Sequence, residues 1–211
     1  MENGMFRTLV LVLCLSSPQW AYAVAEELTE EDTETWGWRT ALFSSLFLSL
    51  AMNPLGADEY NASIMMSEDE DVGAVKFGFK WHKDDLSFDL FGAEVTHYYL
   101  LGYSYWQSLD IDGQEGVVNA VEFVPVFRFN WSYSNWLSYL ETSVGLSVLS
   151  RSGINDKRFS TNFQFTDSLS FGGYITPKSS WSLQLQHFSN NSIKLPNNGI
   201  NFYNFNYAYR Y

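Results

Sequence analysis

The 211-residue sequence is poor in cysteine, in basic residues and in long hydrophobic runs. Its single cysteine, Cys14, has no second cysteine with which to form an intramolecular disulfide. Lysine and arginine number 12 against 24 acidic residues, and a net charge of −12 offers no basic surface to nucleic acid. After the N-terminal 23 residues, no stretch reaches the roughly 18 uninterrupted apolar residues of a membrane-spanning helix. These absences exclude a nucleic-acid-binding protein, a disulfide-stapled domain and a helical membrane protein.

The N-terminus has the pattern of a signal peptide, which we assign to residues 1–23. Arg7 precedes an apolar run, and Ala21-Tyr22-Ala23 offers a small-x-small cleavage site. A buried N-terminal helix is the alternative. Lipoprotein attachment at Cys14 is rejected because Leu13 is not the small residue that such a site prefers. Removal of this segment would leave a mature chain without cysteine, which fits a protein of the bacterial envelope.

Residues 24–56 precede the regular part of the sequence. Residues 24–35 are acidic, which is typical of an unstructured linker. Residues 36–55 contain the apolar run TALFSSLFLSLAM, which is too short to span a bilayer as a helix. This run is an interfacial helix, a plug inside a barrel or an extra strand, and the sequence leaves the choice open. The domain proper is expected at residues 57–211.

From residue 57 onward, apolar and polar residues alternate with a period of two, the pattern of β-strands with two different faces. Val121, Phe123 and Phe127, for example, alternate with Glu122 and Arg128. Eight strands are predicted, at residues 59–66, 74–81, 94–106, 119–131, 137–149, 159–175, 181–189 and 199–211.

Connections between these strands alternate in length. Short turns are expected at residues 82–85, 132–136 and 176–180, and longer polar loops at 67–72, 107–118, 150–157 and 190–198. A soluble β-sandwich or lipocalin-like barrel is the alternative, but the many Ser, Asn and Gln residues on one face would leave polar groups unpaired in a soluble core. We therefore predict an all-β fold, an eight-stranded antiparallel transmembrane β-barrel of the outer membrane.

Two candidate catalytic residues, His187 and Ser189, lie two positions apart at the end of one predicted strand. They share a row with Leu183 and Leu185, which is the lipid-facing side. An even number of strands puts both termini in the periplasm, so this strand runs outward and the pair lies near the lipopolysaccharide of the outer leaflet. Serine becomes a good nucleophile when a base removes its proton, and histidine is the base that titrates near neutral pH. The pair suggests hydrolysis of an acyl ester at the membrane surface.

The segment HFSNNSIKLPNNGI at residues 187–200 resembles the outer-membrane lipid A 3-O-deacylase family, which is PagL-like and also called acyloxyacyl hydrolase. The family pattern is His-x-Ser-Asn, a variable loop, and then Pro-Asn-x-Gly-Ile. Weaker similarity extends over residues 57–211. The resemblance implies an eight-stranded barrel that removes the 3-O-linked acyl chain of lipid A without a metal or other cofactor.

By position, the resemblance also implies roles for individual residues. His187 would be the general base and Ser189 the nucleophile. The oxyanion hole, which stabilises the tetrahedral intermediate, would come from Asn190, Ser192 and the backbone of the loop that contains them.

One position departs from the family. Its enzymes place a glutamate after Gly-Ile to orient the histidine, whereas this chain has Asn201. An amide oxygen can accept the imidazole N–H but cannot stabilise an imidazolium by charge. The chain is therefore a working variant, a slow enzyme, or a barrel of the same fold that is catalytically impaired or non-catalytic. Asp167 is a candidate substitute acid if its side chain faces outward, but we favour a bulge that turns Asp167 inward, because a carboxylate facing lipid is costly.

The other ionisable residues have structural explanations. Glu141 belongs to an inward row and is expected to pair with Arg128 or Arg210. His97 is an alternative base, although it fits an aromatic belt at the membrane interface better. The expected partners are lipid A and outer-membrane lipid, and the oligomeric state is left open between a monomer and a homodimer.

Overall fold

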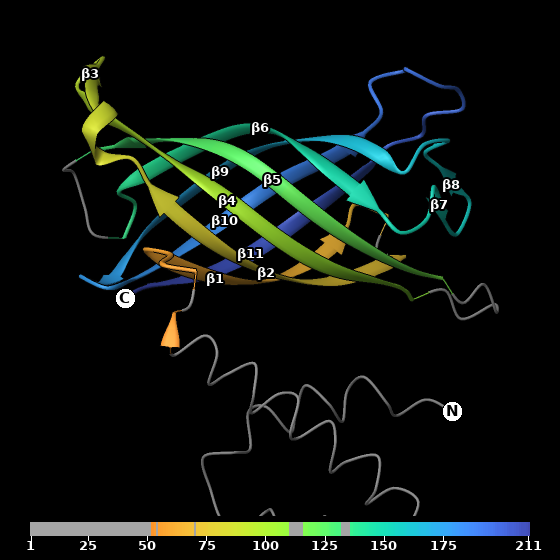
Figure 1. The fold of residues 1–211 in the computed structure, drawn as a ribbon, viewed down its shortest axis with the longest axis horizontal. Helices are drawn as coiled ribbons and strands as arrows, with labels where there is room; N and C mark the ends of the chain where they lie inside the picture. Colours follow the sequence, from red (N-terminus) through yellow and green to blue (C-terminus); the bar gives the residue numbers. More distant parts are fainter. Residues whose placement is uncertain (1–51, 54, 70, 110–115, 132–135) are drawn as a thin grey trace, which may run out of the picture. The chain divides into compact units, whose positions relative to one another are not determined.

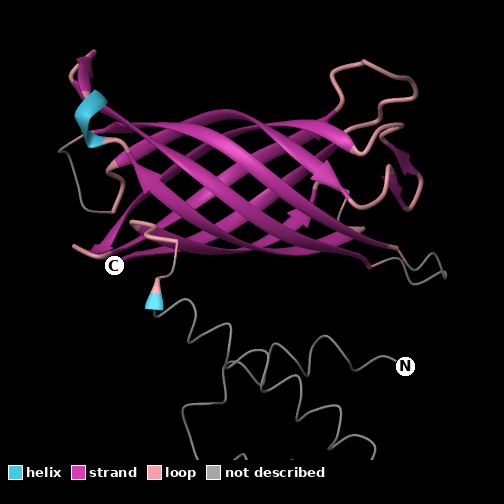
Figure 2. Ribbon diagram, viewed as in Figure 1, coloured by secondary structure: helices cyan, strands magenta, loops and turns pink. Residues whose placement is uncertain are grey.

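The computed structural model describes residues 52–53, 55–69, 71–109, 116–131 and 136–211, most of which belong to one antiparallel sheet rolled into a barrel (Figures 1 and 2). The expected signal peptide and most of the 24–56 segment lie outside the described residues. The barrel strands are β1 (Glu59–Ser67), β2 (Val72–His82), β4 (Ala93–Ser108), β5 (Val117–Asn130), β6 (Tyr139–Leu149), β9 (Phe163–Thr176), β10 (Ser179–Ser189) and β11 (Ile200–Arg210).

The sheet closes on itself between its first and last strands. Each barrel strand pairs antiparallel with the next one along the chain, and β1 pairs with both β2 and β11. Closure removes the sheet edges, so the strand backbones find their hydrogen-bond partners within the sheet. The predicted eight-stranded antiparallel barrel is confirmed. We call the end at which Glu59 pairs with Arg210 the terminal end, and the opposite end, with the β1–β2, β6–β9 and β10–β11 connections, the loop end.

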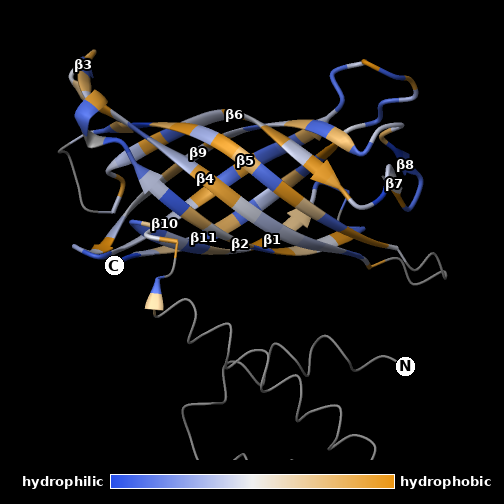
Figure 3. Cartoon of the chain, viewed as in Figure 1, coloured by the Kyte–Doolittle hydropathy of each residue, from blue (hydrophilic) through white to orange (hydrophobic). Residues whose placement is uncertain are grey.

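Apolar and polar residues alternate along the strands, so the two faces of the sheet differ sharply in polarity (Figure 3). Large apolar side chains are exposed on the outside over most of the barrel, among them Ile64, Val75, Leu101, Val121, Phe123, Val144, Leu146, Leu169, Leu183, Leu185 and Phe205. The inward side chains are buried and largely polar, among them Asn61, Ser63, Lys76, Lys80, Glu122, Arg128, Glu141, Gln186 and Asn204. An apolar exterior around a polar interior suits lipid outside, so the soluble alternative, with its apolar face inward, is wrong.

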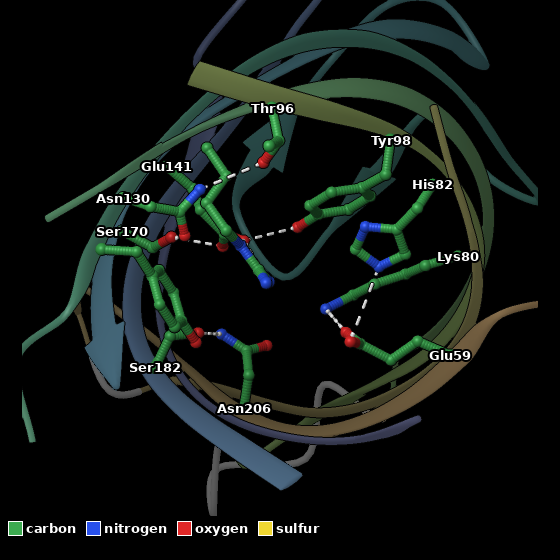
Figure 4. A network of polar contacts seen from close by, with 12 residues as sticks. Glu59, Lys80, His82, Thr96, Tyr98, Asn130, Glu141, Ser170, Ser182 and Asn206 are labelled. Atoms are coloured by element: carbon green, nitrogen blue, oxygen red, sulfur yellow. Dashed lines mark hydrogen bonds and ion pairs between the residues drawn. The ribbon is translucent and has the colours of Figure 1, made fainter. Parts of the chain in front are cut away.

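A network of charged and polar side chains fills the interior toward the terminal end (Figure 4). Glu141 accepts hydrogen bonds from Arg128 Nε at 2.8 Å, from the Tyr98 hydroxyl at 2.8 Å and from the Ser170 hydroxyl at 2.9 Å. Lys80 Nζ donates to Glu59 at 2.5 Å. Burial of such charges is tolerated because each has a partner of opposite sign. The expected pairing of Glu141 is therefore with Arg128.

Toward the loop end the interior is aromatic instead. Trp106, Phe159, Phe188 and Phe202 are fully buried there. The Trp106 ring centroid lies 4.9 Å from those of both Phe188 and Phe202. Phe188 and Phe202 are neighbours in sequence of His187 and Asn201, so their packing holds the ends of β10 and β11 in place.

Two connections differ from the sequence expectation. The expected turn at residues 82–85 is instead a longer connection, with a 3₁₀ helix η1 (Asp84–Leu86) and a short strand β3 (Phe88–Leu90) that pairs with the start of β4. The β3–β4 turn is Phe91-Gly92, in which both residues have positive φ, and such a turn gives no signal in strand periodicity. The expected strand at 159–175 begins at Phe163, because Phe159 packs inside the barrel. The preceding loop contains a small hairpin of β7 (Gly153–Ile154) and β8 (Lys157–Arg158). No helix among the described residues is long and apolar enough to cross a membrane.

The interior network generates a stability prediction. Arg128→Met leaves Glu141 buried without its cation, and we expect the free energy of unfolding to fall by about 3–5 kcal/mol. The double variant Arg128→Met/Glu141→Leu removes both charges and is expected to recover most of that loss. Urea unfolding in lipid vesicles, followed by tryptophan fluorescence, measures both values. Equal destabilisation of the single and double variants would contradict this account.

Candidate active site

His187 and Ser189 lie half-buried on the outer surface at the loop end of β10. They continue the outward row of Leu183 and Leu185, as strand parity predicts. His187 is flanked in register by Asn201 on β11 and by Asp167 on β9. The cross-strand pairing therefore brings together three of the residues that the sequence singled out.

The imidazole of His187 is held by Asn201. His187 Nδ1 lies 2.6 Å from Asn201 Oδ1. An amide oxygen can only accept a hydrogen bond, so Nδ1 carries the proton and donates it. The other ring nitrogen, Nε2, then has a free lone pair, which is the form of the ring that can act as a base.

Gly199 leaves room for the imidazole ring of His187. Its backbone has φ +65°, and a Cβ built on Gly199 would lie 2.8 Å from His187 Cε1 and 3.3 Å from Nε2. A side chain at this position would therefore displace the imidazole from the position in which it contacts Asn201. This close approach gives a physical reason for glycine in the motif PNNGI.

Asp167 faces outward and is exposed, so the expected inward turn is wrong. The bulge between β9 and β10 occurs at Ser179 and Ser180, near the terminal end, and does not change the parity at Asp167. Among the described residues, no hydrogen bond or ion pair joins Asp167 to His187. Its carboxylate stands beside the histidine without orienting it.

Asn190 is engaged in holding the loop between β10 and β11. Its side chain is fully buried, and Nδ2 donates to the backbone oxygens of Phe159 and Lys194, each at 2.7 Å. Its backbone N–H donates to Asn197 Oδ1 at 3.1 Å. These hydrogen bonds use all three N–H groups of Asn190. Ser192, by contrast, is exposed and has φ +61°.

Sequence reasoning missed Glu68, which follows directly after β1. Its Oε2 accepts a hydrogen bond from Asn201 Nδ2 at 2.6 Å, and its backbone N–H donates to the Asn201 carbonyl at 3.0 Å. Glu68 reaches Asn201 because β1 pairs with β11 in a register that continues one residue beyond Ser67 and Phe202. That register joins residues 133 positions apart, and no local pattern specifies it.

A polar pocket of about 240 Å³ opens beside these residues at the loop end. Glu68, Asp69, Lys157, His187, Asn198, Gly199, Ile200 and Asn201 line it. Lys157 forms an ion pair with Asp69, and this hydrogen bond raises the pKa of Lys157. Partial burial would raise the pKa of nearby Asp71, but hydrogen bonds from Ser67 and Asn155 outweigh it and hold that pKa below its ordinary value.

An apolar groove of about 640 Å³ lies along the outside of the barrel, across β1, β11, β10 and β9. Its apolar lining comes from Ile64, Met65, Met66, Leu169, Phe171, Leu183, Leu185, Tyr203 and Phe205. Leu185 and Tyr203 are two positions before His187 and two after Asn201, so the groove starts where the polar residues end. The site thus lies between a polar pocket and an apolar groove.

Comparison with known proteins identifies the family. The family model for lipid A 3-O-deacylase (PagL) matches residues 73–210. The chain belongs to the PagL family. The lipid A deacylase PagL of Bordetella bronchiseptica is 30% identical over 154 residues, which is 73% of this chain and 78% of that protein. PagL of Pseudomonas aeruginosa is 26% identical over 133 residues, 63% of this chain and 75% of that protein.

The fold agrees with this assignment. The crystal structure of the outer membrane enzyme PagL superposes with a TM-score of 0.63 at 22% identity and covers 72% of this chain and 99% of that one. The PagL resemblance noted in the sequence is confirmed, and this barrel is an outer-membrane protein. His97, the alternative base, packs edge-on against the Tyr99 ring and at a tilt against the Phe127 ring near the terminal end, far from the site.

The close approach of Gly199 to His187 is testable. Gly199→Ala is expected to destabilise the fold by about 1 kcal/mol, because alanine is strained at positive φ, and to displace the imidazole from Asn201. The matched control is Gly92→Ala, where φ is +77° and an added Cβ meets nothing within 4 Å. Imidazole ¹⁵N chemical shifts of His187 should change in the Gly199 variant alone. Identical spectra for the two variants would count against this role of Gly199.

Proposed function

We propose that this protein is an outer-membrane serine esterase that hydrolyses the 3-O-linked acyl chain of lipid A from the outer leaflet. The observation that carries the proposal is the outward pair of His187 and Ser189, placed on a family barrel between a polar pocket and an apolar groove. Lipid A combines a polar sugar with acyl chains, and this arrangement offers a surface to each part. Deacylation of lipid A is also the activity named for both relatives.

The proposed reaction proceeds through an acyl-enzyme. The Ser189 hydroxyl attacks the ester carbonyl while His187 Nε2 takes its proton, and a tetrahedral oxyanion forms. Collapse of this intermediate breaks the ester bond, and His187 returns the proton to the departing sugar oxygen. Water, activated by the same histidine, then releases the fatty acid and regenerates Ser189.

The pair has the spacing that this reaction requires. Residues i and i+2 of a strand have Cα atoms about 7 Å apart on one face, so an imidazole and a hydroxyl can approach each other. Stabilisation of the oxyanion falls to the loop after Ser189. The N–H groups of Asn190 are engaged elsewhere, and the backbone N–H of Ile193 donates to the Asn190 carbonyl at 3.1 Å. We therefore assign that role to the backbone N–H groups of Asn191 and Ser192.

Asn201 takes the place of the family's acid in this proposal. Its carbonyl oxygen orients His187 but carries no charge to stabilise the imidazolium, so turnover should be lower than with a carboxylate in direct contact. The second candidate function, a catalytically impaired barrel of the same fold, follows from this position alone.

Mass spectrometry of lipid A tests the proposal. Expression of the protein should remove one 3-hydroxyacyl chain from lipid A, and Ser189→Ala or His187→Asn should lower the rate of release at least about 10³-fold. His97→Asn is the matched histidine control and should keep the wild-type rate. An unchanged lipid A mass with correctly folded wild-type protein would favour the impaired barrel instead. Release that survives in both site variants would contradict the assigned roles.

The apolar groove predicts a chain-length effect. Leu183→Trp narrows the groove away from His187 and should reduce release of long acyl chains relative to short ones by about tenfold, because each methylene group that no longer fits into the groove costs about 1 kcal/mol or more. Leu146→Trp is the control, since Leu146 is 46% exposed against 43% for Leu183 but lies outside the groove. Competition between lipid A species of different chain length measures the ratio. The same ratio in both variants would show that the groove does not hold the chain.

A further inference from the structure

We infer that Glu68 is a positioning residue that sets the orientation of the Asn201 amide and thereby the tautomer of His187. This inference deepens the proposed function and rests on it. From the β1–β2 connection, Glu68 would supply the carboxylate that position 201 lacks. The pair Glu68 and Asn201 would together replace a single orienting acid.

The orientation of an asparagine side chain is otherwise ambiguous, because its oxygen and nitrogen are similar in size. An ionised carboxylate only accepts hydrogen bonds, so the atom of Asn201 that lies 2.6 Å from Glu68 Oε2 must be the donor Nδ2. The oxygen Oδ1 then faces His187 Nδ1, at 2.6 Å. One carboxylate therefore determines which end of the amide the histidine meets.

The reverse orientation would be harmful to the chemistry. With the amide turned over, Nδ2 would donate to His187 Nδ1, and the ring proton would move to Nε2. A protonated Nε2 cannot take a proton from Ser189. In a serine triad, this wrong tautomer, produced by an asparagine in place of the acid, costs about 10⁴-fold in turnover. Glu68 prevents it by making the reverse orientation repulsive, oxygen against oxygen.

The backbone keeps Glu68 in this position. Its N–H donates to the Asn201 carbonyl at 3.0 Å, which extends the pairing of β1 with β11 by one residue. The preceding residue, Ser67, is buried, and its hydroxyl donates to Asp71 at 2.7 Å and accepts from the Val72 N–H at 3.0 Å. The connection that carries Glu68 is therefore held by hydrogen bonds to β11 and within the β1–β2 connection itself.

Glu68 also brings a negative charge to the chain of hydrogen bonds that ends at His187. The imidazolium formed during the reaction would face the amide oxygen of Asn201, whose dipole is aligned by the carboxylate behind it. The charge lies one side chain further away than that of a directly bonded acid, so it should stabilise the imidazolium less. The expected result is a functional enzyme that is slower than one with the acid in direct contact.

The test is the same substitution in two backgrounds. In the natural background, Glu68→Gln replaces a pure acceptor with an amide that can present either atom, and kcat should fall about 10- to 100-fold with little change in KM. In the Asn201→Glu background, residue 201 is itself the acid and two carboxylates meet. There, Glu68→Gln should raise kcat, because it removes the repulsion and donates to the new carboxylate.

This reversal of sign separates positioning from a merely structural role. A loss of equal size in both backgrounds, or no loss in the natural one, would overturn the inference. Glu94→Gln, an exposed glutamate near the terminal end, is the matched control and should change nothing. Heat-modifiable gel mobility verifies that each variant is folded.

A second measurement needs no catalysis. Imidazole ¹⁵N spectra should show His187 with its proton on Nδ1 in the natural protein and a mixture of both tautomers in Glu68→Gln. The protein has 3 histidines, so comparison with His187→Asn assigns the signals. A protonated Nε2 in the natural protein, or the same tautomer in both proteins, would contradict the inference. If the natural protein releases no fatty acid but shows these spectra, the proposed function fails while the role of Glu68 stands.

Discussion

The structure depends on one constraint, that a chain crossing lipid must pair its backbone N–H and C=O groups within itself. The sheet meets this constraint by joining β1 to β11, and that seam carries the site. His187 lies on β10, Asn201 on β11 and Glu68 at the end of β1, so the row of hydrogen bonds runs across the seam. The closure that lets the barrel exist in a membrane also assembles the polar residues on its surface.

The same constraint explains why a polar site can occupy a lipid-facing surface. Strict alternation gives inward residues to the core and outward residues to the surroundings. Phe188 and Phe202, which follow His187 and Asn201 in the sequence, point inward and pack against Trp106. Successive residues around His187 therefore have two different roles. The buried aromatic rings fix the backbone, and the fixed backbone positions the polar side chains that face outward. The cost of polar groups near lipid is reduced because they hydrogen-bond to one another and lie at the loop end.

Much of this fold could be predicted from the sequence because its signals are local. Period-two alternation specified the eight strands and the outward row of His187, and the motif at residues 187–200 specified the family. Asp167 was misjudged because a costly outward carboxylate suggested a bulge, whereas the bulge lies at Ser179 and Ser180. The β3 hairpin was missed because the Phe91-Gly92 turn depends on backbone angles rather than on polarity. Glu68 could not be found, since its partner is set by the register of closure across most of the chain.

Asparagine at position 201 makes the site sensitive to that closure in a way that an acid would not. A carboxylate offers an acceptor whichever way it is turned, so a histidine beside it meets oxygen in either case. An amide offers oxygen on one side and nitrogen on the other, and the choice must come from a third group. Here that group arrives from β1, the strand furthest in sequence from the site. In a chain whose first strand had not yet closed the barrel, Asn201 would have no preferred orientation and His187 no preferred tautomer. His187 would therefore become a competent base only once β1 has paired with β11 and the barrel is closed.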